Sequence, residues 1–162
     1  MLGLHPNYEK IDYYILLDEF CFLKKGNYFM FRLAEEKDLD FISKWDQHID
    51  RKELKTILSL KRVYIAENED NFMGWLRYNL FWDSIPFMNM LYFLEDYRKK
   101  GIGREFVAYW EKEMQKLGYQ RVMTSTVSKE YAQHFYYKLG YIGIGGFMLQ
   151  GEPYEIILEK EL

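Results

Sequence analysis

The chain has 162 residues and a formal net charge of −3, with 49% hydrophobic and 19% aromatic residues. This length suits one domain whose core needs no disulfide, and the composition excludes a disordered chain. The acidic balance does not suit a nucleic-acid-binding surface, and no uncharged run has the length of a membrane span. Cys21 is the single cysteine, and no Cys or His pair has metal-ligand spacing. We therefore expect a cytoplasmic protein without a structural metal, a membrane partner or a nucleic-acid partner.

The first 27 residues contain an apolar stretch whose spacing favours a helix. Apolar residues recur at helical spacing from Ile11 to Leu23, and Gly26 follows as a helix-stop signal. The broad apolar surface of this helix indicates packing against the same chain or a partner. We expect a helical extension over residues 1–27 and a domain over residues 28–162. Translation from Met30 is an alternative that would remove the extension.

From residue 28 onward, hydrophobic periodicity predicts an alternation of strands and helices. The expected strands are 28–33, 62–66, 72–82, 87–94, 121–127, 141–148 and 154–158. The expected helices are 38–48, 52–60, 101–117 and 130–139.

Two of these strands should form a hairpin, because a polar turn of four residues, 68–71, separates 62–66 from 72–82. The strand at 87–94 is apolar enough to be buried on both faces, and a helix follows it. Such a helical crossover implies a parallel strand pair. We therefore predict an α/β fold of the α+β type, with a mixed and strongly bent central sheet.

Residues 98–104, Arg-Lys-Lys-Gly-Ile-Gly-Arg, concentrate positive charge between a strand and the strongest predicted helix. The first amides of a helix have no partner inside the helix, and the positive end of its dipole faces outward. Glycines at 101 and 103 allow a ligand to approach the backbone and tolerate unusual dihedral angles. The segment therefore suits a pyrophosphate, although a merely solvated helix start remains an alternative.

Other glycine motifs do not explain this segment. A phosphate loop of the nucleotide-hydrolase type requires Gly-Lys followed by Ser or Thr, which is absent. A dinucleotide fingerprint would need a third glycine where the chain has Phe106. The later glycines Gly143, Gly145 and Gly146 are more typical of a bulge or bend in a strand than of a second anion site.

Two segments carry a family resemblance. Tyr97-Arg98-Lys99-Lys100-Gly101-Ile102-Gly103 resembles the central motif of the GNAT superfamily of acetyl-CoA-dependent N-acetyltransferases, in which Arg or Gln is followed by two residues, Gly, one residue, and Gly or Ala. Ala132-Gln133-His134-Phe135-Tyr136-Tyr137-Lys138-Leu139-Gly140-Tyr141 resembles the second signature of this family. Both motifs occur in the expected order, and the resemblance covers the chain from about Met30 to its C-terminus.

The resemblance implies a bent sheet with helices on both faces and acetyl-CoA as co-substrate. In this family the strand before the first motif separates from its neighbour, and its backbone binds the pantetheine arm; the matching residues are Leu91 and Phe93. The pyrophosphate would lie on the backbone amides of Lys99, Lys100, Gly101, Ile102, Gly103 and Arg104. Arg98, Lys100 and Arg104 would add charge. Lys129 stands where the family often has asparagine, so Ser128 is the expected substitute there.

The resemblance also implies direct attack by a primary amine on the thioester in a ternary complex. The match assigns the proton donor to the leaving thiolate as Tyr136, or as Tyr137 if the register shifts by one. Either tyrosine is also compatible with a core position on an amphipathic helix. The general base stays open: Asn89 on the nearby strand is no base, and a solvated surface position is the favoured explanation for each carboxylate considered. These carboxylates are Asp83, Glu95, Asp96, Glu152 and Glu155.

The expected acceptor is a small-molecule or peptide amine, and homodimerisation stays open. We expect the acceptor pocket opposite the cofactor, between the early helices, the turn at 81–87 and the last hairpin. Aromatic side chains and carboxylates in these segments would suit a cationic amine. Two rival hypotheses are a non-catalytic acyl-CoA sensor of the same fold and an interaction module that associates through its N-terminal helix.

Overall fold

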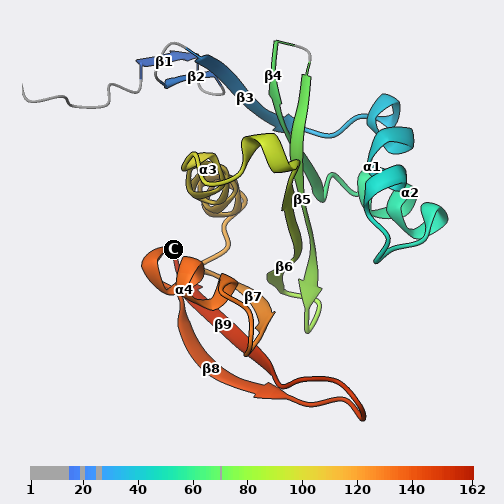
Figure 1. The fold of residues 1–162 in the computed structure, drawn as a ribbon, viewed down its shortest axis with the longest axis vertical. Coiled ribbons are helices and arrows are strands. Elements are labelled where there is room, and N and C mark those ends of the chain that lie inside the picture. The colour runs from blue at the N-terminus through green and yellow to red at the C-terminus, as the bar shows by residue number, and fades with distance from the viewer. Residues whose placement is uncertain (1–14, 19–20, 25–26, 70) are drawn as a thin grey trace, which may run out of the picture.

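The computed structural model describes residues 15–18, 21–24, 27–69 and 71–162 (Figure 1). Within these residues nine strands form one sheet in the order β1-β2-β3-β4-β5-β6-β7-β9-β8. The strands are β1 (Ile15–Asp18), β2 (Cys21–Lys24), β3 (Asn27–Leu33), β4 (Val63–Asn68), β5 (Asn71–Phe81), β6 (Ile85–Phe93), β7 (Arg121–Val127), β8 (Ile142–Phe147) and β9 (Glu155–Glu161). The helices are α1 (Leu39–Trp45), α2 (Arg51–Ser59), α3 (Ile102–Lys116) and α4 (Ala132–Lys138), with 3-10 turns η1 (Glu36–Asp38) and η2 (Glu95–Tyr97).

The element order predicted from residue 28 onward is confirmed. β4 and β5 form the expected antiparallel hairpin, and β6 pairs with β7 in parallel. All other neighbouring strands in the described part of the sheet pair antiparallel. The predicted irregularity in the last hairpin is also present, because the pairing of β8 with β9 shifts between Gly143 and Gly145.

The predicted N-terminal helix is wrong where the structure describes that segment. β1 and β2 are antiparallel strands, and β2 pairs with β3 from Cys21 opposite Met30 to Lys24 opposite Asn27. Residues 1–14, which include the start of the predicted helix, lie outside the described residues. Periodicity alone cannot separate a strand from a helix in short apolar runs. Here the edge of β3 supplies the hydrogen-bond partners for extended backbone.

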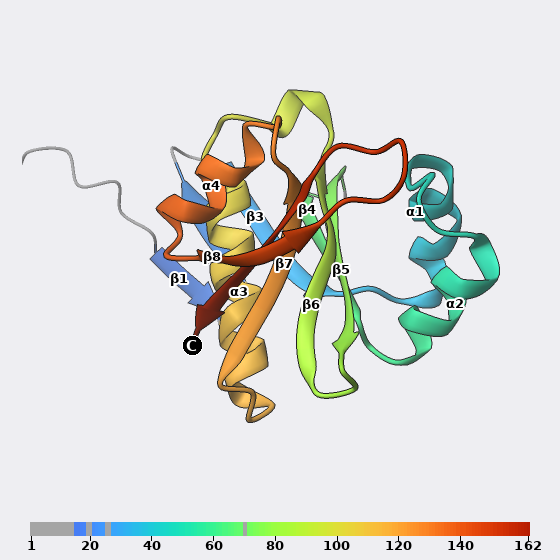
Figure 2. The same ribbon diagram turned by 90° about the horizontal axis from the view of Figure 1, so that it is seen from below.

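Helices cover both faces of the sheet, as predicted. Figures 1 and 2 show α1 and α2 beside one face, and α3 and α4 beside the other. Under α1 and α2 a smaller core is formed by Leu39, Ile42, Leu54, Ile57, Val63, Ile65 and Trp75. The larger core contains Phe106 and Trp110 of α3, both fully buried against strands β3 to β9. No helix in the described parts of the chain has the length and apolar character to cross a membrane.

β6 is the strand that positions the site, and one expectation about it is wrong. Asn89 is exposed, and Phe87 and Leu91 are only partly buried, so the strand is not buried on both faces. The physical reason is that β7 accompanies β6 over only part of its length. The pairing consists of Phe87 opposite Met123 and Met88 opposite Thr124. Beyond these pairs the two strands separate.

Candidate active site

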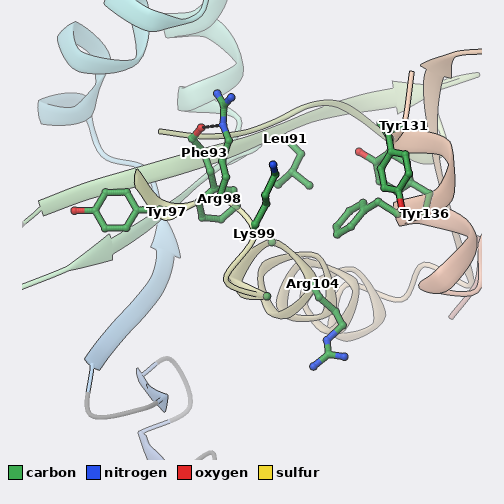
Figure 3. Close-up of a pocket in the computed structure, with 12 residues that line it drawn as sticks. Leu91, Phe93, Tyr97, Arg98, Lys99, Arg104, Tyr131 and Tyr136 are labelled. Carbon is green, nitrogen blue, oxygen red and sulfur yellow. Dashed lines mark hydrogen bonds between the residues drawn. The ribbon is translucent and has the colours of Figure 1, made fainter. Parts of the chain in front are cut away.

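A pocket of about 610 Å³ lies where β6 and β7 separate (Figure 3). Its lining comes from the end of β6, the loop before α3, the first turn of α3, and α4. The lining residues are Leu91, Phe93, Tyr97, Arg98, Lys99, Gly101, Gly103, Arg104, Tyr131, Ala132, Phe135 and Tyr136. Where β6 and β7 are still paired, the Thr124 hydroxyl donates to the Met88 carbonyl at 3.0 Å.

The N-terminus of α3 opens onto this pocket. Gly101 is its N-cap residue and has φ 80° and ψ −2°, a left-handed conformation that favours glycine. Gly101 has no side chain that could cap the helix, so nothing from the N-cap residue competes for the first amides. A Cβ on Gly103 would touch only the rings of Phe93 and Phe135 at ordinary distances. The helix start therefore fits an anionic group such as a pyrophosphate.

The four basic residues of the motif point in different directions. Lys99 has φ 57° and directs its side chain into the pocket (Figure 3). Lys100 does not line the pocket; its ammonium group lies 5.8 Å from the centre of the Tyr97 ring. Arg104 lines the pocket but pairs with Glu105 at 3.2 Å, and in Figure 3 its guanidinium points away from the cavity.

The Arg98 side chain contacts the protein backbone and an aromatic ring. Its Nε atom donates to the Phe93 carbonyl at 2.7 Å. Its guanidinium carbon also lies 4.9 Å from the centre of the Tyr92 ring. In Figure 3 this guanidinium points away from the N-terminus of α3. Of the four basic side chains, that of Lys99 is therefore the best placed to face a bound anion.

The remaining predicted cofactor residues divide between the pocket and other contacts. Leu91 and Phe93 line the pocket. The Ile102 side chain is buried in the core, so only its backbone faces the helix start. Ser128 does not line the pocket: its amide donates to the Tyr154 carbonyl at 2.8 Å, and its own carbonyl accepts from Gln133.

Tyr136 and Tyr137 lie in different environments. Tyr136 is only 7% exposed and lines the pocket, with its hydroxyl 3.9 Å from the Met88 sulfur. Burial raises the pKa of Tyr136 to about 12, although a hydrogen bond with Thr124 works in the opposite direction. Tyr137 is 42% exposed and lies outside the pocket lining. Of the two tyrosines, the structure brings only Tyr136 to the pocket.

Sequence reasoning did not assign a role to several lining residues. Tyr131, Ala132 and Phe135 share one face of α4 and its start with Tyr136. Their spacing of one, four and five residues is the signal that could have found them, since residues four apart on a helix lie on the same side. Tyr131 is 76% exposed, so it lies at the outer rim of the pocket.

None of the candidate bases belongs to the lining of the cofactor pocket in the described part of the chain. Within the described residues its lining contains no carboxylate. The expected acceptor pocket stays a prediction, and Figure 2 shows the β5–β6 turn apart from the β8–β9 loop. Among the described residues no group of His, Cys, Asp or Glu side chains could hold a metal ion.

Diverging strands beside a glycine-capped helix start are the arrangement expected of an enzyme that binds an acyl-CoA. A sequence model of the Acetyltransferase (GNAT) family matches residues 26–141, and the chain belongs to this family. It is an acetyl-CoA-dependent N-acyltransferase. A search of curated proteins found no match.

Solved structures agree with this assignment at the level of the fold. A GNAT-family acetyltransferase from Bacillus cereus is 22% identical, with a TM-score of 0.68 over 82% of this chain and 96% of that one. The ribosomal-protein-S18-alanine N-acetyltransferase from Escherichia coli is 15% identical, with a TM-score of 0.68 over 82% and 93%. The spermidine/spermine N-acetyltransferase from Vibrio cholerae is 15% identical, with a TM-score of 0.66 over 82% and 92%.

Proposed function

We propose that this acyltransferase moves the acetyl group of acetyl-CoA directly to a primary amine in a ternary complex, with Tyr136 as the donor to the leaving sulfur. The observation that carries this proposal is the buried Tyr136 hydroxyl at the inner end of the pocket, 3.9 Å from the Met88 sulfur. A phenol whose pKa is about 12 stays protonated at neutral pH. Because an ordinary thiol has a pKa of about 8.5, Tyr136 would act mainly by donating a hydrogen bond to the developing thiolate.

The proposed cofactor site uses the backbone from Lys99 to Arg104 for the pyrophosphate and the separated end of β6 for the pantetheine arm. The left-handed Gly101 and the uncapped start of α3 support the first assignment. The position of Leu91 and Phe93 in the pocket supports the second. Lys99 supplies the main side-chain charge, whereas Ser128 has no direct part.

The proposed acceptor is a cationic small-molecule or peptide amine that meets the β8–β9 hairpin. Phe147 and Tyr154 are 46% and 44% exposed, and Glu152 in the intervening loop is exposed as well. Aromatic faces beside a carboxylate attract a cation. The structural neighbours named above include one enzyme for polyamines and one for a protein alanine, so both kinds of amine belong in a test.

Titration of the full chain with acetyl-CoA in a calorimeter tests the cofactor site, with Gly101→Trp as the variant that should fill the cradle. We expect binding for the wild type and none for the variant. Release of the CoA thiol, followed over a panel of cationic, neutral and anionic amines, tests transfer. Preference for anionic or neutral amines would refute the acceptor proposal. Tight binding with no turnover on any amine would instead favour an acyl-CoA sensor.

Three further parts of this proposal concern the whole protein. We assign residues 28–162 to the acetyltransferase domain and residues 1–27 to an addition, which agrees with a family match that begins at residue 26.

We also propose a homodimer, because the edge strand β8 exposes Ile142, Ile144 and Phe147. Light scattering during gel filtration would test the dimer. A single cysteine supports the proposed cytoplasmic location.

A further inference from the structure

Arg98 makes an unusual contact for a basic residue beside the proposed pyrophosphate site. Its Nε atom donates to the carbonyl of Phe93, the last residue of β6, at 2.7 Å. Its guanidinium group lies over the ring of Tyr92, 4.9 Å from the ring centre. Tyr92 packs against the core under α1 and α2, through a ring contact of 4.6 Å with Trp75. The charged end of Arg98 is therefore anchored beside the opposite face of the sheet from α3.

The Phe93 carbonyl is a group that β7 would bond if the two strands stayed paired. The Leu94 amide donates to the Met73 carbonyl of β5 at 2.8 Å. In a planar trans peptide the carbonyl of Phe93 points opposite to the amide of Leu94. It therefore faces away from β5, toward the side from which β7 has departed. An unpaired strand carbonyl of this kind needs another donor, and Arg98 provides it.

We propose that Arg98 is a positioning residue that replaces the missing β7 partner and thereby fixes the open end of β6 and the cofactor loop. The hydrogen bond joins Phe93, in the proposed pantetheine site, to the residue that directly precedes the proposed pyrophosphate cradle. This hydrogen bond connects two parts of one binding site that are five residues apart in the chain. Arg98 acts through its donor atom, and its positive charge does not contribute to binding the pyrophosphate. The inference rests on the proposed placement of acetyl-CoA in this pocket.

Two variants that both remove the positive charge of Arg98 distinguish the effect of its hydrogen-bond donor from the effect of its charge. In Arg98→Gln the carboxamide can still donate to the Phe93 carbonyl, whereas in Arg98→Met the donor is lost with the charge. We expect Arg98→Gln to keep the acetyl-CoA Kd within about threefold of wild type. Arg98→Met should raise this Kd by about tenfold, as expected for one lost hydrogen bond. KM for acetyl-CoA should rise in parallel, with kcat for a saturating amine changed less than twofold.

Salt dependence is the second measurement, made by titration at about 50 mM and about 500 mM NaCl, where screening differs strongly. Both variants should keep the salt dependence of the wild type, because the charge removed is not the one that contacts the anion. Lys99→Gln should reduce it. Melting temperatures check that each variant is folded, and we expect all of them to fold because Arg98 is an exposed residue.

Equal loss of affinity in Arg98→Gln and Arg98→Met, with a weaker salt dependence in both, would overturn the inference and assign Arg98 to the pyrophosphate. Wild-type affinity in both variants would overturn it as well, since the hydrogen bond would then have no role in binding. A wild-type chain that does not bind acetyl-CoA would refute the proposed function and this inference together. If the wild type binds acetyl-CoA but Arg98→Gln loses as much affinity as Arg98→Met, only the inference about Arg98 is refuted.

Discussion

The Tyr136 hydroxyl lies 3.9 Å from the sulfur of Met88, at the last paired position of β6 before this strand separates from β7. The contact places a protonated phenol at the inner end of the pocket, beside a backbone that can no longer pair with its neighbour. A thioester that reaches this point meets Tyr136, which among the described residues is the only tyrosine of the second motif in the pocket lining.

Removal of this hydroxyl should slow the reaction with little effect on binding. For Tyr136→Phe we expect a decrease in kcat of about 10²-fold, the lower end of the range for a positioned proton donor, and an unchanged acetyl-CoA Kd. Tyr137→Phe is the matched control and should keep normal kcat, because Tyr137 lies outside the pocket. Since the pKa of Tyr136 is about 12, its ionisation should cause no loss of kcat below about pH 11. A pH–rate profile on both proteins checks this, and equal kcat in Tyr136→Phe and wild type would refute the role.

Glycines at the two ends of α3 allow a paired test of the proposed pyrophosphate cradle. Gly101 precedes the helix with φ 80°, and Gly118 follows it with φ 90° and open space around its Cα. Alanine at either position is strained at positive φ and should lower the free energy of unfolding by about 1 kcal/mol. Only Gly101→Ala should also weaken acetyl-CoA binding, by about tenfold. If Gly118→Ala weakened binding equally, strain in the helix would explain the effect and the cradle would not.

Charge in the cradle should come from Lys99. We expect Lys99→Gln to raise the acetyl-CoA Kd by about fivefold at low salt, which corresponds to one exposed charge contact of about 1 kcal/mol. The effect should shrink at about 500 mM NaCl because of screening. Lys112→Gln, an exposed position farther along α3, removes the same charge and should have no effect on Kd. Titration calorimetry at both salt concentrations distinguishes a local contact from the general field of the protein.

The connection between α1 and α2 depends on a buried ion pair. Asp46 is 2% exposed and accepts from Arg77 Nε at 2.7 Å and from Trp75 Nε1 at 3.1 Å. Burial alone would raise the pKa of Asp46, but the hydrogen bonds and charge of Arg77 outweigh burial, and the pKa is lowered. Asp46→Asn leaves Arg77 buried without its partner and should cost about 3 kcal/mol of stability.

Denaturant unfolding at pH 7 measures this loss. The double variant Asp46→Asn with Arg77→Met should lose less stability than Asp46→Asn alone, because no buried charge remains unpaired. The stabilisation by Asp46 should be present above the ordinary aspartate pKa of 3.8 and should disappear as the pH falls through the lower folded pKa. A double variant that is less stable than the single one would contradict this account.

Alkaline pH should destabilise the fold through its buried tyrosines. Burial raises the pKa values of Tyr64, Tyr78, Tyr136 and Tyr141 above the ordinary 10. Above pH 10 the unfolded chain releases these protons while the folded chain keeps them, so unfolding becomes more favourable as the pH rises. Melting temperatures measured from pH 8 to pH 11 should be constant at first and then fall above about pH 10. A rising melting temperature over that range would show that these phenols are not buried in solution.

The fold was predictable where the signals are local. Gly118 and Gly140 follow helices α3 and α4 at positive φ, which is the usual position for a glycine directly after a helix. The strand–helix order around Gly101 follows from periodicity and turn chemistry within short windows. The helix predicted over residues 15–24 was wrong, because a short apolar run is compatible with the periodicity of both a helix and a strand. Pairing with β3 placed β2 in the sheet.

The sequence by itself determined the order of elements, the glycine-capped start of α3 and the two motifs that indicate an acetyl-CoA enzyme, since each depends on neighbours within a few residues. Tertiary structure alone decided how the basic residues divide their roles, because the direction of Arg98 depends on a carbonyl that β7 leaves unpaired. It also selected Tyr136 over Tyr137, and it separated the β5–β6 turn from the β8–β9 loop. These properties arise from contacts between segments far apart in the chain, which local spacing does not encode.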